Sequence, residues 1–231
     1  MHIPDGYLSP LTAVPLMAVM VPVWGVAVKK VRETVKKKDV PLLAVGAAFS
    51  FTIMMFNIPI PGGSSAHAVG AVLLAILLGP WAATIGVSVA LLIQALVFGD
   101  GGILAFGANC FNMAFIMPFA GYFVYKLIRG NSEILSGRAI FAAALAGYVG
   151  ITLAALCAGI EFGTQYSLFK AADGTPLYFP YPLKTAVITM VGAHLTLAGP
   201  LDAVATALGV WFVGSSYPTL LPRDARLITN S

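Results

Sequence analysis

Long unbroken apolar runs are the feature that most constrains the fold of this chain. They fall at about residues 11–28, 40–57, 67–78, 80–98, 109–128, 139–160 and 184–213. A membrane-spanning helix needs roughly 20 mostly apolar residues, whereas a transmembrane barrel would show alternation. Only 10% of the 231 residues are charged, far fewer than in a soluble domain. The sequence predicts an all-α polytopic membrane protein of about seven transmembrane helices, with one integral membrane domain over residues 1–231.

The basic residues predict how these helices are oriented. Six of the ten residues from Lys29 to Lys38 are basic, and such a cluster favours the cytoplasmic side. Because the cluster follows the first apolar run, we expect an uncleaved helix and no signal peptide, with the N-terminus outside and the C-terminus cytoplasmic. Only Lys170 and Lys184 then lie outside. Eleven of the 13 basic residues lie inside, among them Lys126, Arg129, Arg138, Arg223 and Arg226.

The three histidines are the candidates for metal chemistry. In the predicted topology His2 and His67 share the outer side, while His194 lies near the middle of the bilayer. A histidine at position two can offer one ion the amine of Met1, its own amide nitrogen and its imidazole. A nitrogen of His67 would complete a plane, which is typical of Ni(II) or Cu(II), with Co(II) as a competitor. The residues alone leave a second interpretation open, in which both histidines make ordinary polar contacts.

Other polar residues within the apolar runs support alternative functions. His194 and Asp202 are eight residues apart, on roughly one helix face, and ionisable groups inside a membrane are functional candidates. An intramembrane enzyme built on this pair is one alternative, and a self-sufficient cation channel or carrier is another. No nucleotide-binding or hydrolase motif accompanies the pair, so a structural polar contact is favoured. Cys110 and Cys157 have no paired spacing and are expected to be small buried residues.

Several motifs resemble one known family over nearly the whole chain. They are MHIPDGYLSP at residues 1–10, PGGSSAHAVG at 61–70, LGPWA at 78–82, QALVFGDGG at 94–102 and GAN at 107–109. They resemble the CbiM/NikM family, the cobalt or nickel substrate-binding subunits of energy-coupling factor (ECF) transporters. The resemblance implies that Met1, His2 and His67 hold the metal. Initiator methionine is normally removed only before a small residue, so the bulky His2 should keep Met1 in place.

The resemblance also implies a function and a set of partners. We expect capture of Ni(II) at the outer face of a prokaryotic plasma membrane, with a cobalt uptake subunit that supplies cobalamin biosynthesis as the alternative. The ion is the transported substrate; no prosthetic group, enzymatic activity or nucleic-acid partner is expected. Since the chain has no nucleotide-binding motif, ABC-type ATPase subunits would drive transport through a transmembrane coupling subunit. A small accessory membrane subunit is also implied, and the chain is expected to end before it.

Two further groups of residues are expected to support this function. Polar residues near the histidines would hold the metal ligands in orientation, with ordinary interhelical hydrogen bonds as the alternative. They are Ser64, Ser65, Gln94, Asn109 and Asn112. Ala44 and Ala48 form a small-xxx-small face on which another helix can approach closely. The resemblance suggests that this face contacts the coupling subunit, and packing within the chain itself is the alternative.

Overall fold

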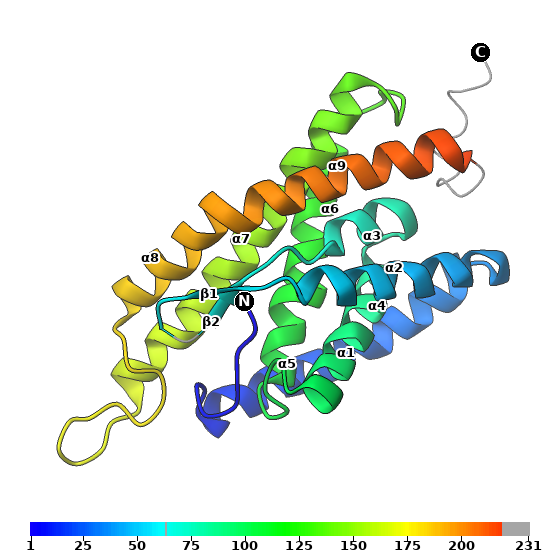
Figure 1. Ribbon diagram of the computed structural model, residues 1–231. Coiled ribbons are helices and arrows are strands. Elements are labelled where there is room, and N and C mark those ends of the chain that lie inside the picture. Colours follow the sequence, from blue (N-terminus) through cyan, green and yellow to red (C-terminus); the bar gives the residue numbers. More distant parts are fainter. Residues whose placement is uncertain (63, 219–231) are drawn as a thin grey trace.

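The computed structural model describes residues 1–62 and 64–218, and in them a helical stretch lies at each of the seven apolar runs (Figure 1). The helices are α1 (Pro10–Thr34), α2 (Val40–Met54), α3 (Ala71–Leu78), α4 (Pro80–Ile93), α5 (Phe106–Asn109), α6 (Met117–Arg129), α7 (Gly137–Leu168), α8 (Leu183–Ala193) and α9 (Gly199–Ser216). Short segments complete the chain: η1 (Lys37–Asp39), strands β1 (Ile58–Ile60) and β2 (Ser64–Ala66), and the π-helical η2 (Gln94–Phe98), η3 (Cys110–Ile116) and η4 (His194–Ala198).

The π-helical segments η3 and η4 join neighbouring helices into longer continuous helices, and η2 extends α4 to Phe98. Among the described residues, five continuous stretches are long and apolar enough to cross a membrane, which confirms a polytopic helical membrane protein. They are Pro10–Thr34, Pro80–Phe98, Phe106–Arg129, Gly137–Leu168 and Leu183–Ser216. At 1.5 Å per residue, α2 and α3 reach only about 22 and 12 Å, less than the roughly 30 Å hydrocarbon core. The predicted count of seven crossings therefore stays a prediction.

Helix α7 is the central element of the bundle and contacts α6, α8 and α9. Its sequence explains this position, because small buried residues recur every four positions at Ala146, Gly150, Ala154 and Ala158. A face without bulky side chains lets neighbouring helices approach closely in a membrane, where helix association depends on tight packing. Cys110 is buried in the same core, and Cys157 is half-buried; both are free thiols.

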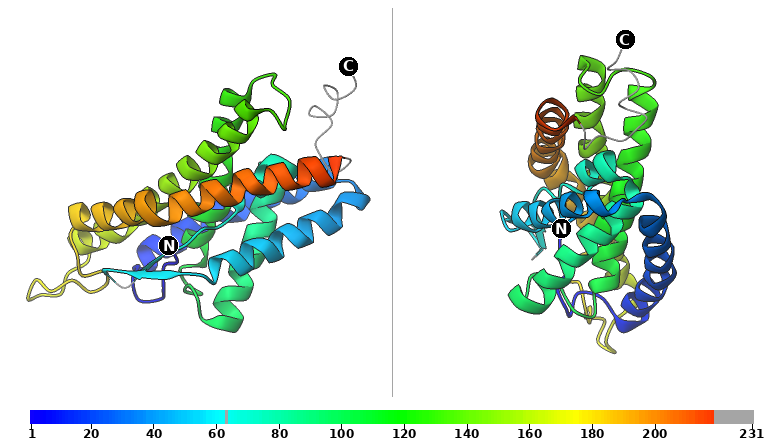
Figure 2. Two further views of the ribbon diagram at one scale, coloured as in Figure 1. Left: turned by 45° about the horizontal axis from the view of Figure 1, so that its top comes forward. Right: turned by 90° about the vertical axis from the view of Figure 1, so that its right-hand side faces the viewer.

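The connections of the bundle separate into two ends. The α1–α2 and α6–α7 connections lie away from the long loop 169–182 (Figure 2). Most of the basic residues stand in these two connections or in the helix ends beside them. The predicted orientation, in which these basic connections are cytoplasmic, stays a prediction. Arg223 and Arg226, predicted on a cytoplasmic tail, lie outside the described residues.

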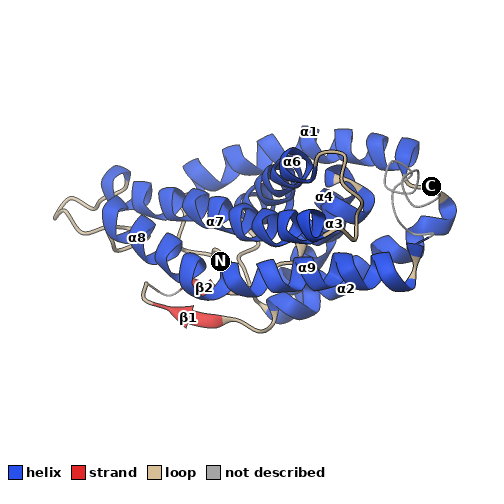
Figure 3. Ribbon diagram, turned by 90° about the horizontal axis from the view of Figure 1, so that it is seen from above, coloured by secondary structure: helices blue, strands red, loops and turns tan. Residues whose placement is uncertain are grey.

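The N-terminal segment runs into the interior of the molecule (Figure 3). Met1 and Ile3 are fully buried. Ser9 caps α1 by accepting a hydrogen bond from Leu11, and Pro10 occupies the first helical position, where a missing N–H costs nothing. The backbone N–H of Ser9 donates to Oε1 of Gln165 at 2.9 Å, which ties the start of α1 to the end of α7. These contacts fix where the first two residues lie.

Candidate metal centre

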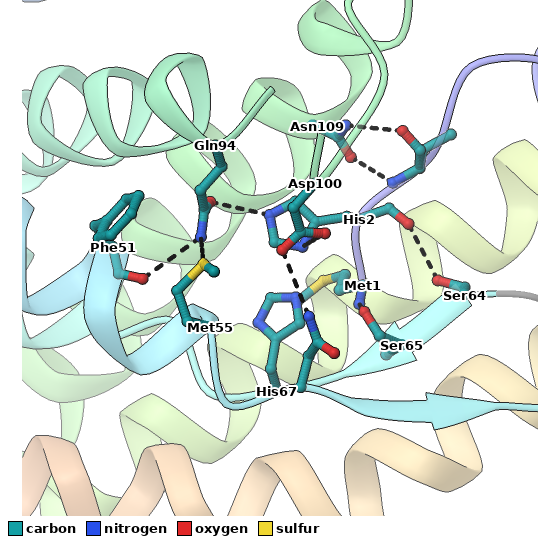
Figure 4. Close-up of polar contacts among 12 residues, drawn as sticks. Met1, His2, Phe51, Met55, Ser64, Ser65, His67, Gln94, Asp100 and Asn109 are labelled. Carbon is teal, nitrogen blue, oxygen red and sulfur yellow. Dashed lines mark hydrogen bonds and ion pairs between the residues drawn. The ribbon is translucent and has the colours of Figure 1, made fainter. Parts of the chain in front are cut away.

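The amino group of Met1 lies at the centre of a polar cluster (Figure 4). It donates hydrogen bonds to the backbone oxygen of Ser65 and, at 3.0 Å, to the Ser65 hydroxyl. Burial lowers the pKa of this amine to about 4, against the opposing effect of the nearby Asp100 carboxylate. The amine is therefore uncharged at neutral pH, so that its nitrogen carries a lone pair that a metal can use.

The imidazole of His2 is held in one tautomer by Gln94. His2 Nε2 lies 3.1 Å from the Gln94 side-chain oxygen, which can only accept, so Nε2 carries the hydrogen and Nδ1 keeps a lone pair. Gln94 is oriented in turn, because its Nε2 donates to the Phe51 carbonyl at 3.4 Å. Burial, followed by repulsion from the terminal amine in its protonated form, lowers the pKa of His2 to about 3. Nδ1 is buried and forms no hydrogen bond to any described residue.

His67 presents its other ring nitrogen to the same cluster. Its Nδ1 lies 3.1 Å from the backbone oxygen of Ala68, so Nδ1 donates and Nε2 is left with the lone pair. Within the described ranges this buried Nε2 has no hydrogen-bonding group opposite it. Burial is the main reason that the pKa of His67 lies well below its usual value, and repulsion from the amine and from His2 in their protonated forms lowers it further. The two rings are stacked, with centroids 4.6 Å apart and planes at 29°.

The segment from His67 to Gly70 is an extended loop, which corrects the predicted helical run at 67–78. The carboxylate of Asp202 accepts hydrogen bonds from Val69 N at 3.1 Å and Gly70 N at 2.8 Å, and the Ser50 hydroxyl donates to the Val69 oxygen. Gly70 has φ +72°, which favours glycine, and α3 begins after it. Apolar composition alone did not predict this loop. Its backbone groups are satisfied by the side chains of Ser50 and Asp202, which are distant in the sequence.

Further contacts fasten the N-terminal segment beside the histidines. Asn109, the last residue of α5, makes hydrogen bonds of 2.8 and 3.1 Å to the backbone N–H and oxygen of Ile3. The Ser64 hydroxyl donates to the His2 oxygen at 3.2 Å. The carboxylate of Asp5 accepts from the N–H groups of Ile103 and Leu104, both at 2.9 Å. The backbone around His2 is thus bonded on both sides.

Asp100 is a site residue that the sequence analysis missed, although it stands within the matched stretch 94–102. Its Oδ1 lies 3.5 Å from His2 Nδ1, and Asn57 Nδ2 approaches Oδ2 at 3.5 Å. Burial raises the pKa of the Asp100 carboxyl, and the terminal amine opposes that shift. The next residue, Gly101, has φ +91°, and a Cβ there would lie 3.2 Å from His2 Cδ2. This glycine lets the loop pass directly over the imidazole.

Most of the predicted site residues come together in this cluster. Those brought together are Met1, His2, Ser64, Ser65, His67, Gln94 and Asn109. Asn112 is not among them, because its Nδ2 donates to Glu161 of α7 at 2.8 Å. Three residues beyond Asn109 and within η3, it faces a different neighbour.

His194 and Asp202 have separate hydrogen-bonding neighbours. His194 Nδ1 lies 2.7 Å from the Met190 oxygen, while Asp202 holds the loop after His67. Among the described residues, the two side chains make polar contacts with different partners and form no hydrogen bond with each other. Nor do the described residues contain a group of three or more His, Cys, Asp or Glu side chains placed to hold one metal ion. The cluster is distinctive because it combines a chain terminus with two imidazoles.

The chemistry of this cluster is that of a nitrogen-lined cation site. Uncharged amine and imidazole nitrogens suit nickel, copper or cobalt, whereas magnesium and calcium prefer oxygen. Fold and cluster together define a membrane protein with a candidate transition-metal site. The family described as CbiM, cobalt uptake substrate-specific transmembrane region, matches residues 2–220. The chain belongs to this family, a family of metal transport proteins and not of enzymes.

Individual relatives agree with this assignment. The chain is 52% identical over 226 residues to the fused nickel transport protein NikMN of Rhodobacter capsulatus, covering 97% of this chain and 65% of that protein. A crystal structure of a truncated transition metal transporter superposes with a TM-score of 0.89 at 58% identity, covering 93% of this chain and 99% of that one. A second transition metal transporter structure gives 0.88 at 58% identity and 93% coverage of both chains. The chain spans only about two thirds of the length of the fused relative.

Proposed function

We propose that this chain is the substrate-binding subunit of an ATP-driven ECF-type transporter and captures Ni(II) at the outer face of the membrane. One observation carries the proposal: His2 Nδ1 and His67 Nε2 each keep a lone pair, on stacked rings, beside the buried amine of Met1. Two buried acceptors without hydrogen-bonding groups are costly unless something binds them. A divalent transition-metal ion satisfies both at once.

The proposed ligands are the Met1 amine, the amide nitrogen and Nδ1 of His2, and Nε2 of His67. The amine and the amide nitrogen would form a five-membered chelate ring that includes the metal. Nδ1 would close a second chelate ring through the His2 side chain. Because the His2 amide donates no hydrogen bond to any residue in the described ranges, its proton can leave without breaking one. A plane of four nitrogens favours Ni(II) over Co(II) when both are present at similar concentration.

Cobalt is the alternative substrate. The family description names cobalt uptake, whereas the Rhodobacter relative is named for nickel. Under this alternative the chain would supply cobalt for cobalamin biosynthesis. Parallel titrations with the two ions distinguish these substrates, and elemental analysis of protein purified from cells shows which ion it carries there.

The proposed partners follow from what the chain must obtain from other subunits. ABC-type ATPases would supply the energy, and a transmembrane coupling subunit would transmit it. On α2, Ala44 and Ala48 are exposed, while Gly46 faces Leu74. This exposure supports a contact between the Ala44–Ala48 face and the coupling subunit. We also propose that a small accessory membrane subunit is a partner. Residues 1–231 would act as one membrane domain.

The test is isothermal titration of Ni(II) into purified protein with one residue added before Met1. The addition converts the terminal amine into an amide, so binding should be lost, as it should in His2→Ala and His67→Ala. One residue added after Ser231 is the matched control and should leave affinity unchanged. Wild-type affinity in the N-terminally extended protein would exclude the amine as a ligand. Retention of affinity in both histidine variants would reject the proposed function.

A further inference from the structure

Asp100 lies where the candidate metal centre opens to the surface of the molecule. A cavity of about 250 Å³ is lined by His2, Asn57, Ser65, Asp100 and Gly101, among others. The His2 side chain is only 4% exposed, whereas 22% of the Asp100 side chain is exposed. An ion that enters through this cavity can therefore meet the carboxylate before it reaches the imidazole.

The contact between Asp100 and His2 joins two acceptor atoms. Because His2 Nε2 donates to Gln94, the atom 3.5 Å from Asp100 Oδ1 is an imidazole nitrogen with a lone pair. An ionised carboxylate only accepts. First-row divalent ions bind nitrogen and oxygen at about 2.0–2.2 Å, so two donors up to about 4 Å apart can share one ion. The observed separation lies within that range.

Charge gives a second, independent reason for a carboxylate at this point. A divalent ion held by two imidazoles, an amine and one deprotonated amide keeps a single positive charge. Burying a net charge is costly unless an opposite charge lies beside it. Asp100 supplies one negative charge next to His2, and Asn57 orients it by approaching the other carboxylate oxygen. Glu161 and Asp202 are bonded to groups elsewhere.

We propose that Asp100 is the capture residue: it binds the incoming divalent cation at the mouth of the cavity, passes it to His2 Nδ1, and remains beside the bound ion as its counter-charge. This inference rests on the proposed function and adds a residue that acts on the rate of loading. Negative charge at the mouth of a site raises cation association rates and makes them dependent on salt.

The test compares Asp100→Asn with Asp173→Asn in stopped-flow mixing with Ni(II), followed by tryptophan fluorescence of the full chain. Asp173 lies in the exposed loop 169–182, where it accepts a hydrogen bond from Thr175, so its replacement removes the same charge from another external position. We expect Asp100→Asn to lower the association rate at low salt about tenfold or more and to weaken its salt dependence. Asp173→Asn should stay within about twofold, and Asp100→Glu should recover most of the rate.

Several outcomes separate this inference from the proposed function. An association rate and an affinity of Asp100→Asn equal to those of the wild type would overturn the capture role while leaving the ligands intact. An equal loss in Asp173→Asn would also overturn it, because the effect would then be one of overall charge. If Asp100→Asn fails to fold, the association rate is measured at low and high salt in the wild type and in Asp100→Glu. A rate that does not depend on salt in either protein overturns the capture role. Failure of the wild type to bind Ni(II) would reject the proposed function itself.

Discussion

Asn109 and Ile3 are joined by two hydrogen bonds, one from the Ile3 N–H to the side-chain oxygen at 2.8 Å and one from the side-chain nitrogen to the Ile3 oxygen at 3.1 Å. The amide side chain of Asn109, at the end of α5, thus pairs with both backbone groups of Ile3 as a neighbouring β-strand would. The pair is buried and fixes both the position and the orientation of the N-terminal backbone. The position of the proposed amine and imidazole ligands depends on it.

Replacing Asn109 with Ala should weaken Ni(II) binding without removing a proposed ligand. Ile3 would keep two buried backbone groups without hydrogen bonds, and loss of a group that orients ligands typically costs about 10–100-fold in affinity. Isothermal titration measures the effect. Asn112→Ala is the matched control, since its amide is bonded to Glu161; it should change thermal stability but not affinity. Equal losses of affinity would contradict the role assigned to the Asn109–Ile3 pair.

Asp202→Ala should reduce stability by about 1–3 kcal/mol, because the buried N–H groups of Val69 and Gly70 lose their acceptor. The loop that carries His67 would shift, so Ni(II) affinity should fall as well. Asp202→Asn keeps an accepting oxygen and should recover most of both. His194→Ala should bind Ni(II) nearly normally. An equal loss of affinity in His194→Ala would instead indicate a direct role for that histidine.

The pH dependence of binding should report one proton for each Ni(II) ion at neutral pH. Burial has lowered the pKa of the Met1 amine to about 4 and that of His2 to about 3, so these groups carry no proton there. Only the amide proton leaves, and affinity should rise with pH by about tenfold per unit. In a free Met-His peptide the amine is also protonated, so about two protons should be released. Titrations in buffers of different ionisation enthalpy count these protons; two or more in the protein would contradict the lowered pKa values.

Ala44→Leu or Ala48→Leu should weaken association with the coupling subunit about tenfold or more, because a bulky side chain blocks close helix approach. Ni(II) binding should not change, since both alanines lie on the exposed face of α2. Co-purification with the coupling subunit measures the effect. Val89→Leu on the exposed side of α4 is a control for added bulk. Loss of metal binding with assembly intact would place the alanine face inside the chain.

The predicted orientation can be checked with thiol probes after Cys110 and Cys157 are replaced by Ala. A cysteine at Lys36, between α1 and α2, should react only from the cytoplasmic side. One at Gly174, in the loop 169–182, should react from outside. Labelling of both from the same side would contradict an odd number of crossings between them.

The apolar runs predicted the helices well because a membrane span depends mainly on length and hydrophobicity. Helix ends were less predictable: α1 continues to Thr34 and α7 to Leu168, since polar residues at the ends of an apolar run do not stop a helix. The grouping of His2 with His67 was predicted by chelate chemistry and resemblance. Asp100 was not, because only the fold brings the loop 99–102 over the imidazole, and nothing local marks that contact.

The buried N-terminus sets the order in which the site can be assembled. The Met1 amine bonds to Ser65, 64 residues later, and the Ile3 N–H bonds to Asn109, 106 residues later. Contacts of such long sequence separation form late, because the chain between them must be ordered first. Under the proposed function, an acyl group on the amine would convert it into an amide and remove that nitrogen as a metal ligand. Under the same proposal, maturation of the first residue is therefore a precondition for metal loading.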